Sequence, residues 1–172
     1  MINILRQRRS IRQYRDQPIE QEKIDILKES LLRSPSSRNF KPWEFIVVDD
    51  KDIIEKLAHA KQHGSAFLAD APLAIVVLGD ATISDAWIED CSIASIIAQF
   101  SAQTLGLASC WVQIRLRQHD ENKTSEQYIK ELLGIPEQIK VESIIGIGYP
   151  AEEKAGIPYD TLSFDKIHEN NW

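Results

Sequence analysis

The sequence predicts a fold of alternating helices and strands built around one long, buried helix. The chain has 172 residues, of which 43% are hydrophobic, and this is within the usual range for one domain with a sizeable core. Helical and strand-like patterns alternate along the chain, and residues 84–105 form a stretch that is apolar on nearly every face. We therefore expect residues 1–172 to form a single domain.

The first half of the chain is expected to contain two helices and two strands. Residues 20–33 place Ile24, Leu27 and Leu31 at helical spacing between polar residues, which predicts an amphipathic surface helix. A polar loop over 34–39 ends it. The elements expected next are a strand over Trp43–Val48, a helix over 52–61 and a fully buried strand over 72–78.

The second half begins with the long helix over 84–105. Since a helix that is apolar all round must be buried all round, we expect its own domain and a second subunit to cover it. A strand over 109–115, a helix over 125–133 and a strand over 141–149 follow. Residues 151–172 mix Pro, Gly and aromatic residues without a period, and the aromatic side chains favour packing on a partner over disorder.

Composition and motifs argue against several classes of function. The net charge of −6 argues against general nucleic-acid binding, and no apolar run is long enough to span a membrane or act as an export signal. Cys91 and Cys110 lack metal or redox spacing, as expected of reduced thiols in a cytoplasmic protein. His59 and His63 have metal-ligand spacing on an expected helix, but no third ligand is near, so we expect no metal site. No dinucleotide-binding glycine motif or catalytic triad occurs.

Two segments carry chemical information. The first fifteen residues contain five arginines and no acid, among them Arg8-Arg9-Ser10-Ile11-Arg12 near the end of a short helical segment. Guanidinium groups suit a phosphate or the carbonyl edge of a heterocycle, although such a run can also be a solvated face. The second segment, Ser34-Pro35-Ser36-Ser37-Arg38-Asn39-Phe40-Lys41-Pro42-Trp43, is a hydroxyl- and amide-rich loop that could equally be a plain turn.

Together, in this order and spacing, the two segments resemble the nitroreductase family. That family opens with Arg-(Arg/His)-Ser-x-(Arg/Lys) and continues, after a helix, with Ser-Pro-Ser-x-x-Asn-x-Gln-Pro-Trp. The resemblance extends through the long helix, the Leu105–Trp111 passage and the Ile147–Glu153 element. It implies an α+β fold, a three-layer α/β/α sandwich with a mixed central sheet, in which two subunits intertwine into a homodimer with two FMN sites.

The resemblance also implies roles for single residues. Arg8, Arg9 and Ser10 would hold the FMN phosphate, and Arg12 would lie near the pyrimidine edge of the ring. Of the other subunit, Pro35, Ser36, Ser37 and Asn39 would reach the flavin. Trp111, Val112 and Gln113 would run along the inner face of the ring, and Lys154 would make a further contact with the phosphate. The full set of expected cofactor-binding residues is Arg8, Arg9, Ser10, Arg12, Pro35, Ser36, Ser37, Asn39, Lys41, Trp111, Val112, Gln113 and Lys154.

Such a flavoprotein would transfer electrons from NADH or NADPH through FMN to a nitroaromatic, quinone or similar small-molecule acceptor. The flavin supplies the hydride chemistry, so no protein nucleophile is needed. Three departures bear on this expectation: Lys41 replaces the usual Gln, Gln113-Ile114 stands where larger members carry an acid and Gly, and Lys154 stands alone where many members have paired basic residues. The alternatives are a flavoenzyme of other chemistry (enone reduction, dehalogenation or flavin breakdown) and an FMN-binding module without turnover.

Overall fold

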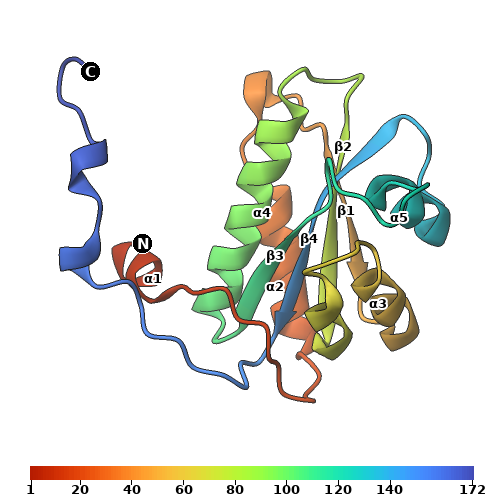
Figure 1. The fold of residues 1–172 in the computed structure, drawn as a ribbon, viewed down its shortest axis with the longest axis horizontal. Helices are drawn as coiled ribbons and strands as arrows, with labels where there is room; N and C mark the ends of the chain where they lie inside the picture. The colour runs from red at the N-terminus through yellow and green to blue at the C-terminus, as the bar shows by residue number, and fades with distance from the viewer.

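The centre of the protein is a four-stranded sheet, described here from a computed structural model of residues 1–172 (Figure 1). The strands are β1 (Trp43–Val48), β2 (Leu73–Asp80), β3 (Ala108–Gln113) and β4 (Ile139–Gly148), and their order in the sheet is β1-β2-β4-β3. All three neighbouring pairs are antiparallel.

The expectation of a mixed sheet is therefore wrong for the strands of one chain. The helix α4 (Trp87–Thr104) connects β2 to β3, which run parallel to each other but are not neighbours. The last strand, β4, inserts between them and pairs antiparallel with both. Parallel strands are thus present, but β4 separates them.

Helices cover both faces of the sheet, which confirms the three layers. Figure 1 shows α4 and α2 (Gln21–Leu32) on one face and α3 (Lys51–Ala58) and α5 (Ser125–Leu133) on the other. Each interface contains a core cluster of fifteen buried residues. One cluster joins α2 and α4 to alternate residues of the strands, and the other joins α3 and α5 to the residues between.

Local signals explain where the elements begin and end. The strand over Trp43–Val48 and the helix over 125–133 lie where the sequence predicts them. Thr124 and Gln127 form a reciprocal cap at the start of α5, and Gly134 ends it with a φ of 67°. The helix expected over 52–61 instead ends at Ala58, whose carbonyl accepts a hydrogen bond from Ser65 Oγ at 2.8 Å.

The long helix is only partly covered within one chain. Ile93 is 39% exposed, and Ile96, Ile97 and Phe100 are half-buried. Ile96 and Ile97 are each three or four positions from both Ile93 and Phe100, so the four residues form one apolar stripe along α4. One chain covers much of the rest of α4, and the expectation that a second subunit covers this stripe stays a prediction.

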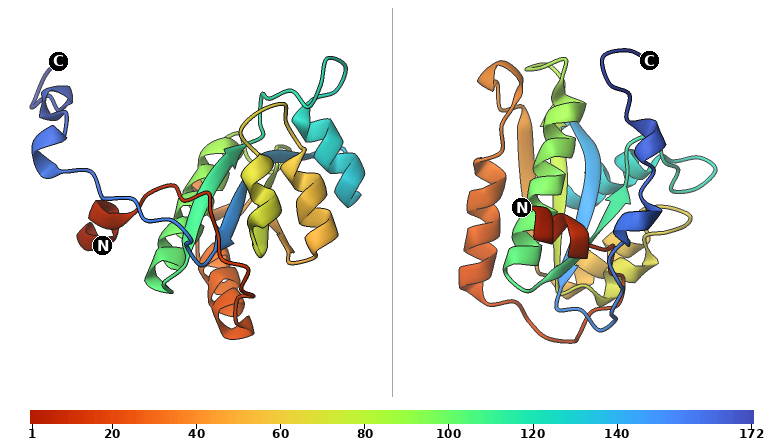
Figure 2. Two further views of the ribbon diagram at one scale, coloured as in Figure 1. Left: turned by 60° about the horizontal axis from the view of Figure 1, so that its bottom comes forward. Right: turned by 90° about the vertical axis from the view of Figure 1, so that its left-hand side faces the viewer.

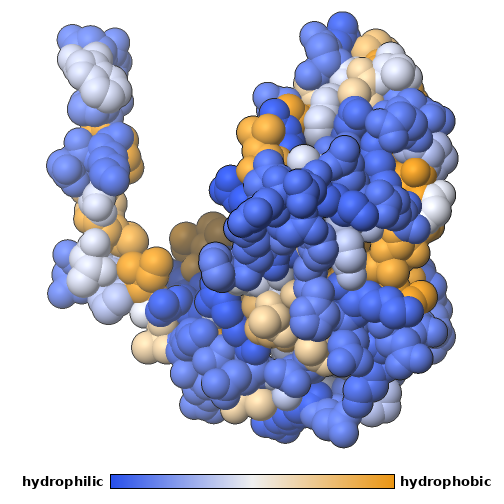
Figure 3. Space-filling model, turned by 45° about the vertical axis from the view of Figure 1, so that its right-hand side comes forward, coloured by the Kyte–Doolittle hydropathy of each residue, from blue (hydrophilic) through white to orange (hydrophobic).

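Both termini leave the body of the molecule. The helix α1 (Ile2–Gln7) and residues 151–172 extend to one side (Figures 1 and 2). None of residues 151–172 is buried, and this arm contains only two short 3-10 turns, Tyr159–Thr161 and Phe164–Lys166. In Figure 3 the arm stands apart from the body and carries hydrophobic side chains among hydrophilic ones.

No helix is both long enough and apolar enough to cross a membrane.

Candidate cofactor site

The arginine-rich segment docks against the start of β3. Ser10 forms a parallel bridge with Ser109, and the Ile11 amide donates to the Ser109 carbonyl at 3.2 Å. Further along, the Tyr14 hydroxyl donates to the carbonyls of Ile11 (2.8 Å) and Gly146 (3.1 Å). These contacts fix the backbone of residues 10–14, so the arginines are presented on a firm support.

Lys154 lies in the same cluster, as its predicted role requires. Its Nζ donates to the Ser10 carbonyl at 3.1 Å and to Glu152 Oε1 at 2.8 Å. Glu152 Oε1 also accepts from the Arg12 amide at 2.6 Å. Hydrogen bonds, first from the Arg12 amide and then from Lys154, lower the pKa of Glu152 below its ordinary value. The structure thus brings Ser10, Arg12 and Lys154 together around a charged carboxylate.

The remaining arginines of the segment have different surroundings. The Arg12 guanidinium lies 5.8 Å from the centre of the Phe67 ring. Arg9 donates to the backbone carbonyl of Ala155 in the arm. Although burial raises the pKa of Cys110, the charges of Arg12, Lys154 and Arg8 oppose that shift. Their positive field therefore extends over the first half of β3.

The strand β3 presents backbone groups on an open edge beside this cluster. It is an edge strand, and the Ser109 carbonyl points away from β4 toward Ile11. In an antiparallel pair this orientation repeats at every second residue. The N–H and C=O groups of Trp111 and Gln113 therefore point to the open edge, where a planar ligand can receive hydrogen bonds.

The side chains of the three predicted β3 residues differ in availability. Trp111 and Gln113 are half-buried, and the Trp111 indole N–H donates to Gln113 Oε1 at 3.0 Å. The Val112 side chain is only 1% exposed and belongs to the core under α3 and α5. Val112 therefore offers no side chain at this edge, and by the same alternation its N–H and C=O groups face β4.

Lys61 joins this edge from the loop after α3. Its Nζ lies 3.5 Å from the Gln113 carbonyl. Burial, and after it the charge of Arg117, lowers the pKa of Lys61. The sequence placed Lys61 at the end of an expected helix and carried no signal that it would reach β3.

The predicted loop forms a separate, well-defined structure. Ser36 Oγ accepts from the Lys41 amide at 2.8 Å, and the Ser37 amide donates to Asp90 Oδ1 at 2.7 Å. Arg38, Asn39 and Lys41 all have φ between 52° and 58°. Left-handed backbone at residues other than Gly is costly and is common at binding sites. Pro35, Asn39 and Lys41 are exposed, whereas Ser36 and Ser37 are half-buried.

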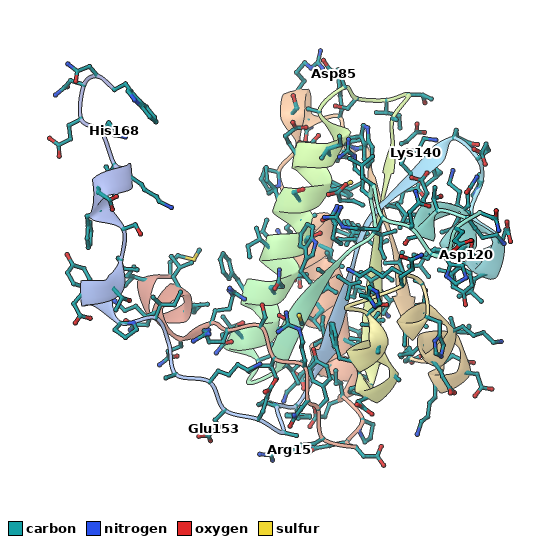
Figure 4. The ribbon with its side chains drawn as sticks, in the orientation of Figure 1. Arg15, Asp85, Asp120, Lys140, Glu153 and His168 are labelled. Carbon is teal, nitrogen blue, oxygen red and sulfur yellow. The ribbon has the colours of Figure 1, made fainter.

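Within one chain, the loop and the arginine cluster do not meet. Ser37 is bonded to Asp90 in the first turn of α4, whereas Ser10 is bonded to Ser109 just beyond its last turn. At 1.5 Å per residue, these ends of α4 are about 20 Å apart. Figure 4 shows the same separation, because Asp85, the ion-pair partner of Arg38, lies at the opposite end from Arg15 and Glu153.

The other features of the chain do not gather the predicted residues. A cavity of about 600 Å³ lies under residues 15–19 and contains none of them. His59 and His63 do not share a helix, since α3 ends at Ala58, and no group of three His, Cys, Asp or Glu residues is placed to hold a metal. Cys91 and Cys110 are buried free thiols.

Comparison with known proteins identifies relatives along the whole chain. The sequence model of the nitroreductase family matches residues 5–66 and 57–149. A solved structure of an FMN-dependent nitroreductase from Clostridium difficile superposes with a TM-score of 0.98 at 46% identity and covers 100% of both chains. A protein of Archaeoglobus fulgidus, provisionally named an NADH dehydrogenase/NAD(P)H nitroreductase, is 37% identical over 96% of this chain and 94% of its own. An FMN reductase [NAD(P)H] of Bacillus subtilis is 26% identical over 99% and 75%.

Proposed function

The chain belongs to the nitroreductase family, and from this premise we propose that it binds FMN between two copies of itself and passes electrons from NADH or NADPH to a small electrophilic acceptor. It is an NAD(P)H nitroreductase-like oxidoreductase by its relatives. The observation that carries the finer proposal is the cationic cluster of residues 8–12 and 154 lying against the open edge of β3.

The residues present fit such a cofactor. Arg8, Arg9 and Ser10 offer charged and hydroxyl donors suited to a phosphate, and Arg9 uses only one of its five N–H donors on the Ala155 carbonyl. The outward amides of Trp111 and Gln113 suit the polar edge of a planar ring, and Trp111 supplies an aromatic surface. When bound, FMN supplies the hydride chemistry. Arg12 would then stabilise negative charge on the ring edge. The rest of the chain would bind the cofactor, orient it and shield it from water.

A second subunit would complete the site. The loop over 35–41 is about 20 Å from the arginine cluster of its own chain by helix length, so its predicted contacts require a partner. The apolar stripe on α4 is continuous and unpartnered, and the arm exposes Tyr159, Phe164 and Trp172 at 71%, 49% and 99%. Two α4 stripes packed together, with each arm wrapped over the other subunit, would cover all of these surfaces.

The acceptor is proposed as a nitroaromatic, a quinone or a similar electrophile taking electrons from the same flavin face that the nicotinamide reduces. A ping-pong sequence follows, because the nicotinamide leaves before the acceptor binds. A non-turnover FMN-binding module is the second candidate, and Gln113-Ile114 is the feature that favours it.

A visible absorption spectrum of the purified protein tests the proposal. Flavin bands that bleach on anaerobic addition of NADH or NADPH, and return with a nitroaromatic or quinone, are expected. Bands that resist both nucleotides would favour the module without turnover. A colourless protein that FMN cannot reconstitute would overturn the cofactor assignment.

A further inference from the structure

Asp90 holds the loop of residues 35–41 to the long helix. It lies in the first turn of α4 and is only 2% exposed. Its Oδ1 accepts a hydrogen bond from the Ser37 backbone amide at 2.7 Å, although the two residues are 53 positions apart in the chain. A buried side chain of α4 is therefore bonded directly to the backbone of the loop.

Few other bonds hold the loop in place. Only two hydrogen bonds join residues 35–41 to the rest of the chain, one from Ser37 to Asp90 and one from Arg38 to Asp85. The Arg38 and Asp85 side chains are 58% and 84% exposed, and an exposed ion pair contributes little. The bond from the Lys41 amide to Ser36 Oγ lies within the loop itself. The bond to Asp90 is therefore the one buried polar restraint on the position of the loop.

The conformation of the loop needs such a restraint. Arg38, Asn39 and Lys41 have φ of 52°, 58° and 52°. Residues other than Gly keep a left-handed backbone only where their surroundings fix it. Ser37 immediately precedes these residues, so its bond to Asp90 fixes the backbone where the strained conformation begins.

The Asp90 carboxylate is incompletely compensated for its burial. Its Oδ2 has no hydrogen-bond partner, and a buried carboxylate with an unpaired oxygen costs folding free energy. The dipole at the start of α4 offsets only part of that cost. An apolar residue would avoid the cost but would leave the Ser37 amide without its acceptor. The gain from an acid at this position is therefore its hold on the loop.

The helix that carries Asp90 also carries the proposed subunit contact. Ile97, in the apolar stripe, follows Asp90 by seven residues, which places it about two turns and about 10 Å further along the same side of α4. A loop bonded to Asp90 is thus fixed relative to the surface that would meet the second subunit. The arginine cluster of the same chain lies beyond the other end of α4, about 20 Å away.

We propose that Asp90 is a positioning residue of the shared site, which holds the Ser37 amide so that the loop of one subunit meets the FMN held by the arginine cluster of the other. The inference rests on the proposed function for the cofactor and the second subunit, and it adds the residue that places the loop. Asp90 touches no cofactor in this account. It acts through the loop, and its effect is on the site that the second subunit's arginines form.

Hydrogen exchange of the Ser37 amide tests the hold in the full chain without cofactor. In Asp90→Ala this amide loses its acceptor, so it should exchange roughly tenfold faster than in the native chain when followed by nuclear magnetic resonance. Asp90→Asn keeps an acceptor oxygen and should restore most of the protection. The matched control is Glu89→Ala, which removes an exposed acid from the same turn of α4 and should exchange like the native chain.

Cofactor affinity supplies the second measurement. Asp90→Ala should weaken FMN binding roughly tenfold, whereas Asp90→Asn should bind FMN within about threefold of the native chain. Glu89→Ala should bind FMN normally. Native exchange of Ser37 or native FMN affinity in Asp90→Ala would overturn the inference. Equal weakening in Glu89→Ala, or no rescue by Asn, would overturn it as well.

A heterodimer shows on which site Asp90 acts. When Asp90→Ala is paired with Arg12→Ala, one site combines a native arginine cluster with a native loop. At an FMN concentration that leaves both homodimers mostly empty, the heterodimer should recover about half of the native FMN content per subunit pair. No recovery would mean that Asp90 acts on the site of its own chain, against the inference. Failure of the native chain to bind FMN would instead refute the proposed function, and the exchange of Ser37 would still decide whether Asp90 holds the loop.

Discussion

The backbone and the side chain of Arg12 make different contacts. Its amide is bonded to Glu152 Oε1 at 2.6 Å, while its guanidinium reaches over Phe67 without an ion-pair partner in the chain. The positive charge is therefore available for a ligand beside β3. Arg15, three residues on, instead donates from Nε to the Pro150 carbonyl at 3.0 Å and lies outside the proposed site.

The first prediction concerns this charge. Arg12→Ala should weaken FMN binding by roughly 10- to 100-fold, the loss expected for a hydrogen bond to a charged group, and should slow flavin reduction. Equilibrium titration with FMN and stopped-flow bleaching measure the two effects. Arg15→Ala is the matched control and should bind FMN normally. Equal FMN retention and bleaching in Arg12→Ala and the native chain would contradict the assignment.

The second prediction is a pH effect of Glu152. Its native pKa lies below its ordinary value of 4.5, so its contacts with Arg12 and Lys154 are fully present above pH 4.5 and are lost as the pH falls through the lowered value. We expect FMN to be released on acidification from about pH 5 to pH 3. Glu152→Gln is neutral at every pH, so its release of FMN should lack the part that depends on this carboxylate. Identical release curves for the two proteins would show that Glu152 does not control binding.

At the residue scale, the sequence predicted the site residues that belong to a motif. It missed the residues that only the fold brings to the site. Ser10, Arg12 and Lys154 are brought together as expected. Lys61 reaches β3 from the loop that follows the early end of α3. A helix end without Gly or Pro has no signature in one sequence, so Lys61 could not be found by pattern.

At the scale of elements, predictability follows local signals. The helix α5 has a capping box and a terminal Gly, and its bounds were predicted to the residue. The end of β2 and the start of β4 were each placed two residues short. These two segments pair with each other beyond a β-bulge, which shifts the register between Val77 and Leu78. The sequence showed that α4 is apolar on nearly every face. Only the structure distinguishes the residues that face the core from those of the exposed stripe.

The third prediction concerns this stripe. Ile97→Lys places a charge in the middle of the proposed helix-to-helix contact and should convert the dimer to monomers, with loss of bound flavin, because desolvating an unpaired charge is costly. Sedimentation velocity and the visible spectrum measure both effects. Thr104→Lys, an exposed position at the end of the same helix, should leave the dimer intact. Ile97→Lys that remains dimeric would place the subunit contact elsewhere.

At the scale of the whole molecule, each chain carries two incomplete parts of a site. The arginine cluster and the open edge of β3 lie beyond one end of α4, and the strained loop lies at the other. The arm leaves the body (Figure 2), and its aromatic side chains are exposed. The three layers were predicted from the sequence, but the position of β4 between β2 and β3 was not, because strand order is set by long-range pairing. The central claim is that two chains complete one flavin site.

Subunit complementation tests that claim most directly. Arg12→Ala damages the arginine half, and Asn39→Gly removes a loop side chain while keeping a backbone that tolerates the observed φ of 58°. Each variant alone should retain little FMN. If the site is shared, a heterodimer of the two has one native site and one doubly damaged site, so it should recover about half of the native FMN content per subunit pair. If one chain forms each site, both sites stay damaged, and no recovery of FMN would contradict the account.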